Sequence, residues 1–236
     1  INNVIYFFFC ENFIKKLIGQ FSIFFLDHNS AKAYLIRDRL GQKPLFYYID
    51  NHNLSFSSNL KSLIKLKNKY DLDNDSINEF LNLGVVTSPH TIFENYYKVE
   101  PGQIIEIDLN KNFHKKTDYY WKLEENYGSE KFNDDVFLDL LLDSIKMRNV
   151  SDVPVANFLS GGIDSSLIVK LQSTIQSKPN TFSVGYEDKK YDESQWSNLV
   201  SEKYSTNHDL MFINIDDLKN LVDKSIDIFD EPYSDP

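Results

Sequence analysis

The run SGGIDSS at residues 160–166 constrains the fold of this chain more than any other feature of its sequence. An apolar stretch of strand type over residues 153–159 precedes the run, and a helical apolar pattern over residues 163–175 follows it. A strand that passes into a helix through paired glycines is where open α/β sheets bind nucleotides. The run therefore predicts an α/β fold with an anion site at the carboxyl end of a strand.

The residue types in this run suit phosphate. Gly161 and Gly162 let the backbone approach an anion closely, and the helix N-terminus adds free N–H groups and a positive dipole. Further donors are the hydroxyls of Ser160, Ser165 and Ser166. The run lacks the Lys of the Walker A pattern and does not follow the GxGxxG spacing, so it is neither of those motifs.

Asp164 is an acid beside the expected phosphates. Magnesium is commonly held by one or two carboxylates together with phosphate oxygens, so we expect Asp164 to be a Mg²⁺ ligand. The alternative is an exposed loop in which Asp164 is only an acid in the first turn of a helix. The strand–loop–helix context favours the phosphate site.

The first half of the chain has a different periodicity. Short stretches of strand type occur at residues 20–27, 33–37, 45–48, 54–57 and 103–109. A helix is expected near residues 59–67. A second should begin near Asp75, because Ser76 and Glu79 have capping-box spacing and Gly84 stands where a C-cap glycine belongs.

A polar stretch at residues 122–135 is expected to link two domains. Beyond it, helical and strand patterns alternate, which predicts a parallel sheet covered on both faces. The apolar faces of the first and third helices should point to the core through Phe137, Leu140, Leu141, Ile145, Trp196, Leu199, Val200 and Tyr204.

Composition excludes some functions. The net charge is −10, which disfavours a general electrostatic grip on nucleic acid or on an anionic membrane. One cysteine cannot form an internal disulfide, so a cytoplasmic protein is expected. Cys10 lies in the apolar run VIYFFFC at residues 4–10, which is too short for a membrane span and should be part of a buried element. The chain has no initiator Met and stops just after an apolar segment, so we expect a fragment.

The segment from Ser151 to Ser166 resembles the synthetase domain of the glutamine-dependent asparagine synthetases, within the N-type ATP pyrophosphatases. The sequences FSVGY at residues 182–186, YDES at 191–194, TNH at 206–208 and DEPYSDP at 230–236 follow that family's order. In the front half, RDRLGQKPLFYY at residues 37–48 resembles the second half of the family's glutaminase domain.

The resemblance implies a fold and a domain plan. Residues 1–121 would be the C-terminal half of an N-terminal-nucleophile glutaminase β-sandwich, and residues 122–135 the linker. Residues 136–236 would begin a doubly wound parallel-sheet ATP-pyrophosphatase domain.

The resemblance also implies site residues. Leu159 and Val184 would contact adenosine through their backbones. The phosphates of ATP would be held by Ser160, Gly161, Gly162, Ser165 and Ser166, with Asp164 on magnesium. Candidates for the aminoacyl substrate site are Asp192, Glu193, Glu231 and Asp235.

Several alternatives stay open. Asp192 and Glu193 could cap a helix, and the cluster of Arg37, Asp38 and Arg39 could be structural. The family's N-terminal cysteine nucleophile is absent, and Cys10 is expected to be inert, so neither catalytic set is complete in this sequence.

The resemblance implies that aspartate, glutamine and ATP are the small-molecule substrates and that asparagine is the product, with neither nucleic acid nor membrane as a partner. A homodimer is a candidate assembly that the sequence does not decide. One alternative function is amidation of another carboxylate, such as a sugar acid, a peptide or a β-lactam precursor. The other is a non-catalytic nucleotide-binding descendant.

Overall fold

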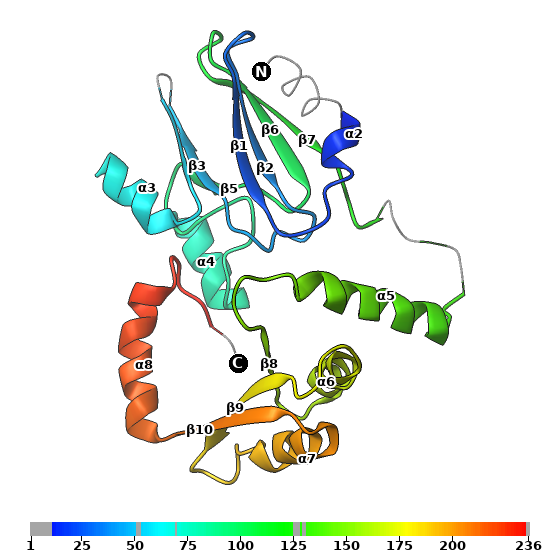
Figure 1. Ribbon diagram of the computed structural model, residues 1–236. Coiled ribbons are helices and arrows are strands. Elements are labelled where there is room, and N and C mark those ends of the chain that lie inside the picture. The colour runs from blue at the N-terminus through cyan, green and yellow to red at the C-terminus, as the bar shows by residue number, and fades with distance from the viewer. Residues whose placement is uncertain (1–10, 51–52, 69, 125–127, 129–130, 235–236) are drawn as a thin grey trace. The chain divides into compact units, whose positions relative to one another are not determined.

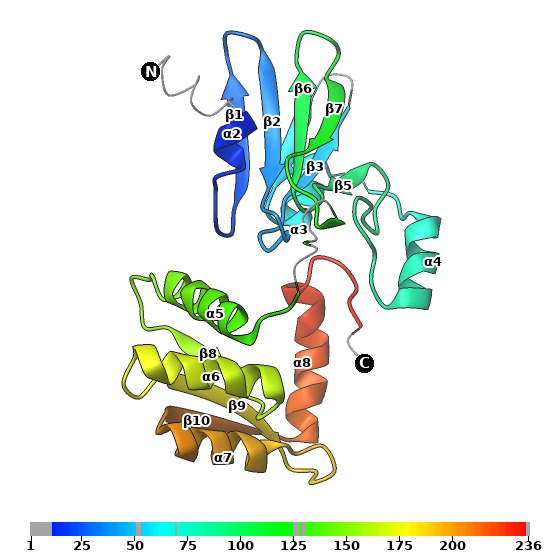
Figure 2. The same cartoon turned by 90° about the vertical axis from the view of Figure 1, so that its right-hand side faces the viewer.

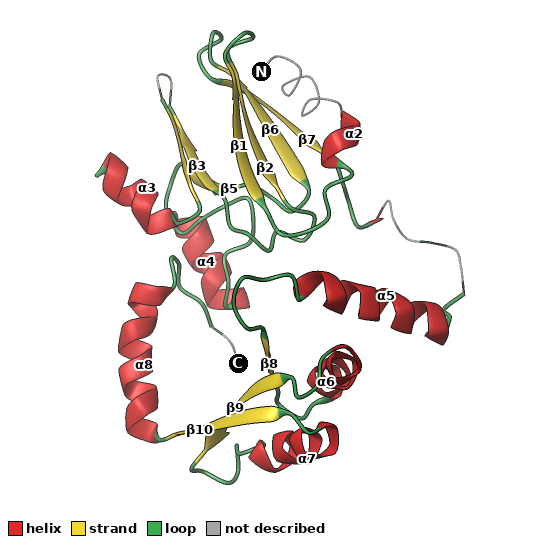
Figure 3. Cartoon of the chain, viewed as in Figure 1, coloured by secondary structure: helices red, strands yellow, loops and turns green. Residues whose placement is uncertain are grey.

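The computed structural model describes residues 11–50, 53–68, 70–124, 128 and 131–234. The chain divides into two compact units. The first unit comprises Ile1–Gly128 together with Ser225–Pro236, and the second comprises Ser129–Lys224. Figure 1 traces both along the chain, and Figure 3 distinguishes their helices from their strands. The chain is thus a mixed α/β protein with antiparallel and parallel sheets, as its sequence predicts at this coarse level.

Two antiparallel sheets form the first unit. The four-stranded sheet consists, in spatial order, of β1 (Ser22–Asp27), β2 (Lys32–Arg37), β6 (Gln103–Asp108) and β7 (His114–Tyr119). The three-stranded sheet consists of β4 (Leu54–Ser57), β3 (Phe46–Ile49) and β5 (Tyr96–Lys98). The strands predicted in this half are all present. β5 and β7 escape the prediction, because β5 is short and β7 is polar along its whole length.

The core of the first unit joins its two sheets. Leu35 of β2 and Ile105 of β6 are buried in one cluster with Tyr47 of β3. On the outer side of the three-stranded sheet, Leu60 and Leu63 of helix α3 (Leu60–Lys67) pack with Tyr96. Alternating burial along β6 explains why its sequence reads as a strand: every second residue faces this core.

The remaining helices of this unit are α2 (Glu11–Ile14) and α4 (Asn74–Leu83). The predicted capping box of α4 is wrong. Asp73 is the N-cap and accepts a hydrogen bond from the amide of Ser76, while Glu79 instead bonds Thr87. Asp caps as well as Ser does, and the observed N-cap lies three residues before Ser76. Gly84 is the C-cap, as predicted.

The second unit holds a parallel sheet whose strands, in spatial order, are β10 (Asn207–Ile213), β9 (Asn180–Tyr186) and β8 (Ala156–Phe158). Its helices are α5 (Asp134–Arg148), α6 (Ile163–Ile175) and α7 (Ser194–Tyr204), and α8 (Ile215–Ile228) runs on into the first unit. Figure 2 shows α6 and α7 lying along the strands.

Burial among the described residues of the second unit departs from expectation in two respects. Among the described residues only one face of the sheet is covered: Thr181 and Ser183 are buried, while Phe182 and Met211 on the other face are exposed. The predicted apolar faces of α5 and α7 are confirmed only in part, because Ile145 is buried and Leu141, Val200 and Tyr204 are half-buried. The exposed members are Phe137, Leu140, Trp196 and Leu199.

Helix α7 turns its small residues inward instead. Ser194, Ser197 and Ser201 are buried. Their hydroxyls find partners, as when Ser197 donates to the carbonyl of Ser194. Small side chains allow the helix to pack closely on the sheet, and a hydrogen-bonded hydroxyl is not costly to bury. Hydrophobic periodicity alone therefore did not identify the most buried residues of this helix.

Candidate functional site

The loop between β8 and α6 depends on close packing at Gly161. Gly161 has a φ of +83°, a backbone conformation that side chains rarely tolerate. A Cβ atom there would lie 2.5 Å from Cβ of Trp196 and 2.7 Å from the amide nitrogen of Ser197. The loop thus passes directly against the first turn of α7, and only glycine fits.

The first turn of α6 is open for a ligand. Gly162 is its N-cap and contributes no side-chain hydrogen bond, so the first N–H groups of the helix are not capped by that residue. Ser160 Oγ lies 3.1 Å from Ser165 Oγ and accepts a hydrogen bond from the amide of Gly162. Ser166 Oγ is buried and has no partner among the described residues. The loop therefore gathers hydroxyl and amide donors at one helix end, where anions are stabilised.

A cavity of about 240 Å³ lies beside this loop, wholly within the second unit. Four residues that the sequence singled out line it: Leu159, Ser160, Val184 and Glu193. The lining that sequence reasoning missed is Phe158, Phe182, Ser183, Tyr186, Tyr191 and Ser197. The sequence of β9 predicts that alternate side chains face opposite sides of the strand. It does not predict which side borders the cavity.

Val184 offers its backbone to this cavity. β8 pairs with β9 only as far as Phe158 against Phe182, and the amide of Leu159 still donates to the carbonyl of Phe182. In a parallel strand the N–H and C=O of a residue point to the same neighbour, and every second residue points to the same side. Val184 therefore directs its backbone groups to the side of β9 where the described β8 has ended.

The backbone groups of Leu159 are less available to a ligand than those of Val184. Its side chain is buried, its amide is used by Phe182, and its carbonyl accepts from the hydroxyl of Ser183. A carbonyl oxygen has a second lone pair, so one further acceptor position remains.

The adjacent acids differ in their surroundings. Asp192 accepts hydrogen bonds from the hydroxyl and amide of Ser194 and from the amide of Tyr186. The bond from the Ser194 side chain is the main cause that lowers the pKa of Asp192. Glu193, the N-cap of α7, makes no capping bond and lines the cavity. Of the two, Asp192 organises the turn and Glu193 faces the cavity.

The remaining acids and Cys10 lie in different parts of the chain. Asp230 and Glu231 contact residues of the first unit, and Asp235 and Cys10 lie outside the described residues. Asp164 is exposed in the first turn of α6. Within the described part of the chain, no group of three or more potential metal ligands occurs. Asp164 alone can contribute one carboxylate, which is what a magnesium ion bound mainly by phosphate and water requires.

The arginine cluster of the first unit organises a loop. Asp38 is buried and accepts from the amides of Gln42 and Lys43, both at 2.9 Å. Arg37 donates to the carbonyls of Lys43, Gly41 and Val99. Each charge is satisfied by backbone groups, which is the arrangement expected of a structural role. Arg39 donates to the carbonyl of Lys15.

This fold and site define a class: an antiparallel β unit joined to a parallel α/β unit whose glycine–serine loop lies beside an open cavity. Residues 4–121 match the glutamine amidotransferase domain, and residues 136–236 match the asparagine synthase family. The chain belongs to the family of glutamine-hydrolysing asparagine synthetases.

Individual relatives agree with this assignment. A Methanocaldococcus jannaschii protein assigned by name to the glutamine-hydrolysing asparagine synthetases is 36% identical over 94% of this chain and 44% of its own length. Glutamine-hydrolysing asparagine synthetase 1 of Bacillus subtilis is 31% identical over 96% of this chain and 36% of its own length. A more distant match is amidase chry2 of Gibberella zeae, 29% identical over 69% of this chain and 24% of its own length. The chain thus spans less than half the length of these relatives.

In the described part of the chain, no helix has the length and apolar character that crossing a membrane requires.

Proposed function

We propose that this chain is part of an enzyme that converts aspartate to asparagine, using ATP and ammonia released from glutamine. The observation that carries this proposal is the loop at residues 160–166, where Gly161 packs against Trp196 beside the cavity that Val184 lines. The names of the relatives support the choice of glutamine and aspartate.

ATP would bind with its adenosine in the cavity and its phosphates at the loop. The backbone of Val184 and the remaining acceptor position of the Leu159 carbonyl would contact the adenosine. The phosphates would be held by the amides and hydroxyls of Ser160, Gly161, Gly162, Ser165 and Ser166. These donors are fixed by the fold before the substrate arrives, which is the arrangement that stabilises developing negative charge.

Asp164 would hold Mg²⁺ at the phosphates. The ion, when bound, neutralises charge on the phosphate oxygens. Exposure of the Asp164 side chain at the helix end that bears the loop is compatible with this role.

The chemistry is adenylation followed by amide formation. A side-chain carboxylate oxygen of aspartate attacks the α-phosphorus of ATP and pyrophosphate leaves. Ammonia then attacks the acyl carbon of the β-aspartyl adenylate, a proton is lost from nitrogen, and AMP leaves. Glu193 is the better placed of the two adjacent acids to approach the substrate, because Asp192 is engaged by Ser194 and Tyr186.

The domain plan is part of the same proposal. Residues 1–121 would belong to an N-terminal-nucleophile glutaminase β-sandwich, residues 122–135 would be a linker, and residues 136–236 would belong to a doubly wound ATP-pyrophosphatase domain. The enzyme would act in the cytoplasm on small molecules, with neither nucleic acid nor a membrane as a partner and with a homodimer as the candidate assembly.

A second candidate is amidation of a different carboxylate, because one relative, amidase chry2, carries a name other than asparagine synthetase. Assays of the full-length protein with glutamine and ATP separate the two. Aspartate-dependent release of AMP and pyrophosphate, with asparagine formed, supports the proposal. Formation of ADP and phosphate would refute adenylation, and turnover with another carboxylate but not aspartate would favour the second candidate.

A further inference from the structure

The chain that follows helix α8 is built into the first unit. Residues 225–236 cluster with Ile1–Gly128, although the intervening Ser129–Lys224 forms a unit of its own. The second unit is therefore bounded in sequence at both ends by chain that belongs to the first. The linker at residues 122–135 is one of these connections, and the segment after α8 is the other.

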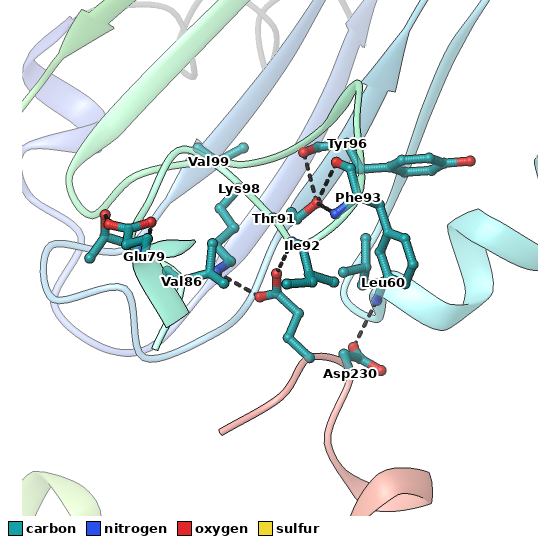
Figure 4. A network of polar contacts seen from close by, with 12 residues as sticks. Leu60, Glu79, Val86, Thr91, Ile92, Phe93, Tyr96, Lys98, Val99 and Asp230 are labelled. Atoms are coloured by element: carbon teal, nitrogen blue, oxygen red, sulfur yellow. Dashed lines mark hydrogen bonds and ion pairs between the residues drawn. The ribbon is translucent and has the colours of Figure 1, made fainter. Parts of the chain in front are cut away.

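Two carboxylates hold this segment. Asp230 Oδ2 accepts a 2.7 Å hydrogen bond from the amide of Leu60, and its Oδ1 accepts one of 2.8 Å from Asn59 Nδ2. Figure 4 shows Asp230 facing Leu60 at the start of helix α3. A carboxylate at this position satisfies an amide that the helix leaves free and complements the helix dipole.

Glu231 occupies a second position nearby. Its Oε1 accepts a 2.8 Å bond from the amide of Ile92, and its Oε2 lies 2.6 Å from Nζ of Lys98. Both charged side chains of this pair are only 14% exposed, and Lys98 also donates to the carbonyl of Val86 (Figure 4). An ion pair that is this buried, with additional hydrogen bonds on both partners, differs from a solvent-exposed surface ion pair.

Ser234 adds a third contact. Its amide donates to the carbonyl of Gly84, the C-cap of α4, at 2.9 Å. Gly84 has a φ of +74°, and a Cβ atom there would approach the carbonyl oxygen of Ser234 to 3.0 Å. The first unit thus offers matched donors and an acceptor along residues 230–234.

We propose that residues 230–234 are an anchoring strap, held in a socket of the first unit that is made by Asn59, Leu60, Gly84, Ile92 and Lys98. The strap fixes the second end of the α/β unit to the first unit. Asp230 and Glu231 act as positioning residues, since each of their four carboxylate oxygens already has a protein partner. This assignment differs from the substrate-contact role that the family resemblance suggests for Glu231.

Amide hydrogen exchange in the intact chain tests the socket directly. Asp230→Ala should accelerate exchange at Leu60 by about ten-fold or more, as expected when a charged acceptor is lost. The amide of Ser62 is the internal control, because it donates to Asn59 Oδ1 in the same helix turn. Glu231→Ala should likewise accelerate exchange of the Ile92 amide, which donates to Glu231. Unchanged exchange at Leu60 and Ile92 in these variants would overturn the strap.

Nicking the chain tests the anchoring. After proteolytic cleavage within residues 122–135, the two pieces of the wild-type chain should co-elute in gel filtration. In Asp230→Ala/Glu231→Ala, and in Lys98→Met from the socket side, the pieces should separate. Glu106→Gln is the matched control, because it breaks another 2.6 Å ion pair of the first unit, with Lys32, and should leave the pieces together.

Circular dichroism before cleavage tests whether each variant is folded. If a variant is unfolded, the conservative variant Glu231→Gln is used in its place. Separation of the wild-type pieces, or co-elution of the strap variants, would show that residues 230–234 do not anchor the chain. Neither result depends on the reaction proposed above, so failure of one proposal leaves the other standing.

Discussion

The hydroxyl of Ser183 on β9 donates a hydrogen bond to the carbonyl oxygen of Leu159, the residue that immediately precedes the glycine–serine loop. Both residues are buried. The bond ties the start of the loop to the neighbouring strand at the point where β8 ends. Position and orientation of the loop therefore depend on a side chain 24 residues further along the chain.

Loss of this bond should loosen the loop. Ser183→Ala is expected to lower stability by about 1 kcal/mol, the usual net value of a buried hydrogen bond, and to weaken ATP binding. Thermal unfolding with and without ATP measures both effects. Ser173→Ala removes an exposed hydroxyl hydrogen bond within α6 and is the control. Equal behaviour of the two variants would contradict a role for Ser183 in holding the loop.

The paired glycines should respond differently to alanine. Gly161→Ala combines a positive φ with contacts below 3 Å to Trp196, so we expect a loss of roughly 2–4 kcal/mol in the free energy of unfolding. At Gly162 the φ is −66° and the nearest atom to an added Cβ is Ser160 Oγ at 3.3 Å. Gly162→Ala should leave stability nearly unchanged but weaken ATP binding, because a methyl group then lies where phosphate approaches. Denaturant unfolding and ATP titration test this, and a stable Gly161→Ala variant would refute the close packing.

Asp164→Asn tests the magnesium role. The swap preserves shape and removes the charge, so in the full-length enzyme it should slow asparagine formation by roughly 100-fold. Glutaminase activity assayed alone should change much less. If Asp164 only interacts with the helix dipole, the effect is confined to about 1 kcal/mol of stability or less. Near-wild-type asparagine formation would therefore exclude the metal ligand. Titrating this chain with ATP at varied Mg²⁺ gives a second readout.

His208 should make stability depend on pH. Burial lowers the pKa of His208 below its ordinary value of 6.5, and its Nδ1 lies 2.9 Å from Thr181 Oγ1. Because the unfolded chain then binds the proton more readily, the contribution of His208 is fully present above pH 6.5 and decreases as the pH falls below it. His208→Gln should reduce this acid-side loss of stability. His114→Gln, at an exposed position, is the control, and an unchanged pH profile in His208→Gln would contradict the assignment.

Arg37 should not tolerate replacement by lysine. Its guanidinium donates to three carbonyls, and a lysine ammonium cannot reach all of them in the same planar geometry. Arg37→Lys is expected to cost about 1.5–3 kcal/mol of unfolding free energy, measured by chemical denaturation. Glutamine-dependent activity should fall only in proportion to the folded fraction. A stable but inactive variant would instead indicate substrate contact.

The sequence by itself determined the local elements and the loop. Helix α6 begins and ends where its pattern predicts, and the strands that were predicted in the first unit differ from expectation only at their ends, although β5 and β7 were not predicted. Such features follow from the periodicity of neighbouring residues and from the backbone conformations that only glycine adopts readily. Both are properties of short segments. The same is true of the helix end that offers donors to an anion.

Tertiary structure decided which faces are buried and which acids are free. Nothing local distinguishes Asp192, bonded to Ser194, from Glu193, which lines the cavity. Likewise α7 buries serines where its apolar periodicity pointed elsewhere. The partner of Glu231 is Lys98, 133 positions earlier in the chain. Contacts of this kind depend on which surfaces folding brings together. A local sequence pattern does not show which residues far apart in the chain become neighbours in space.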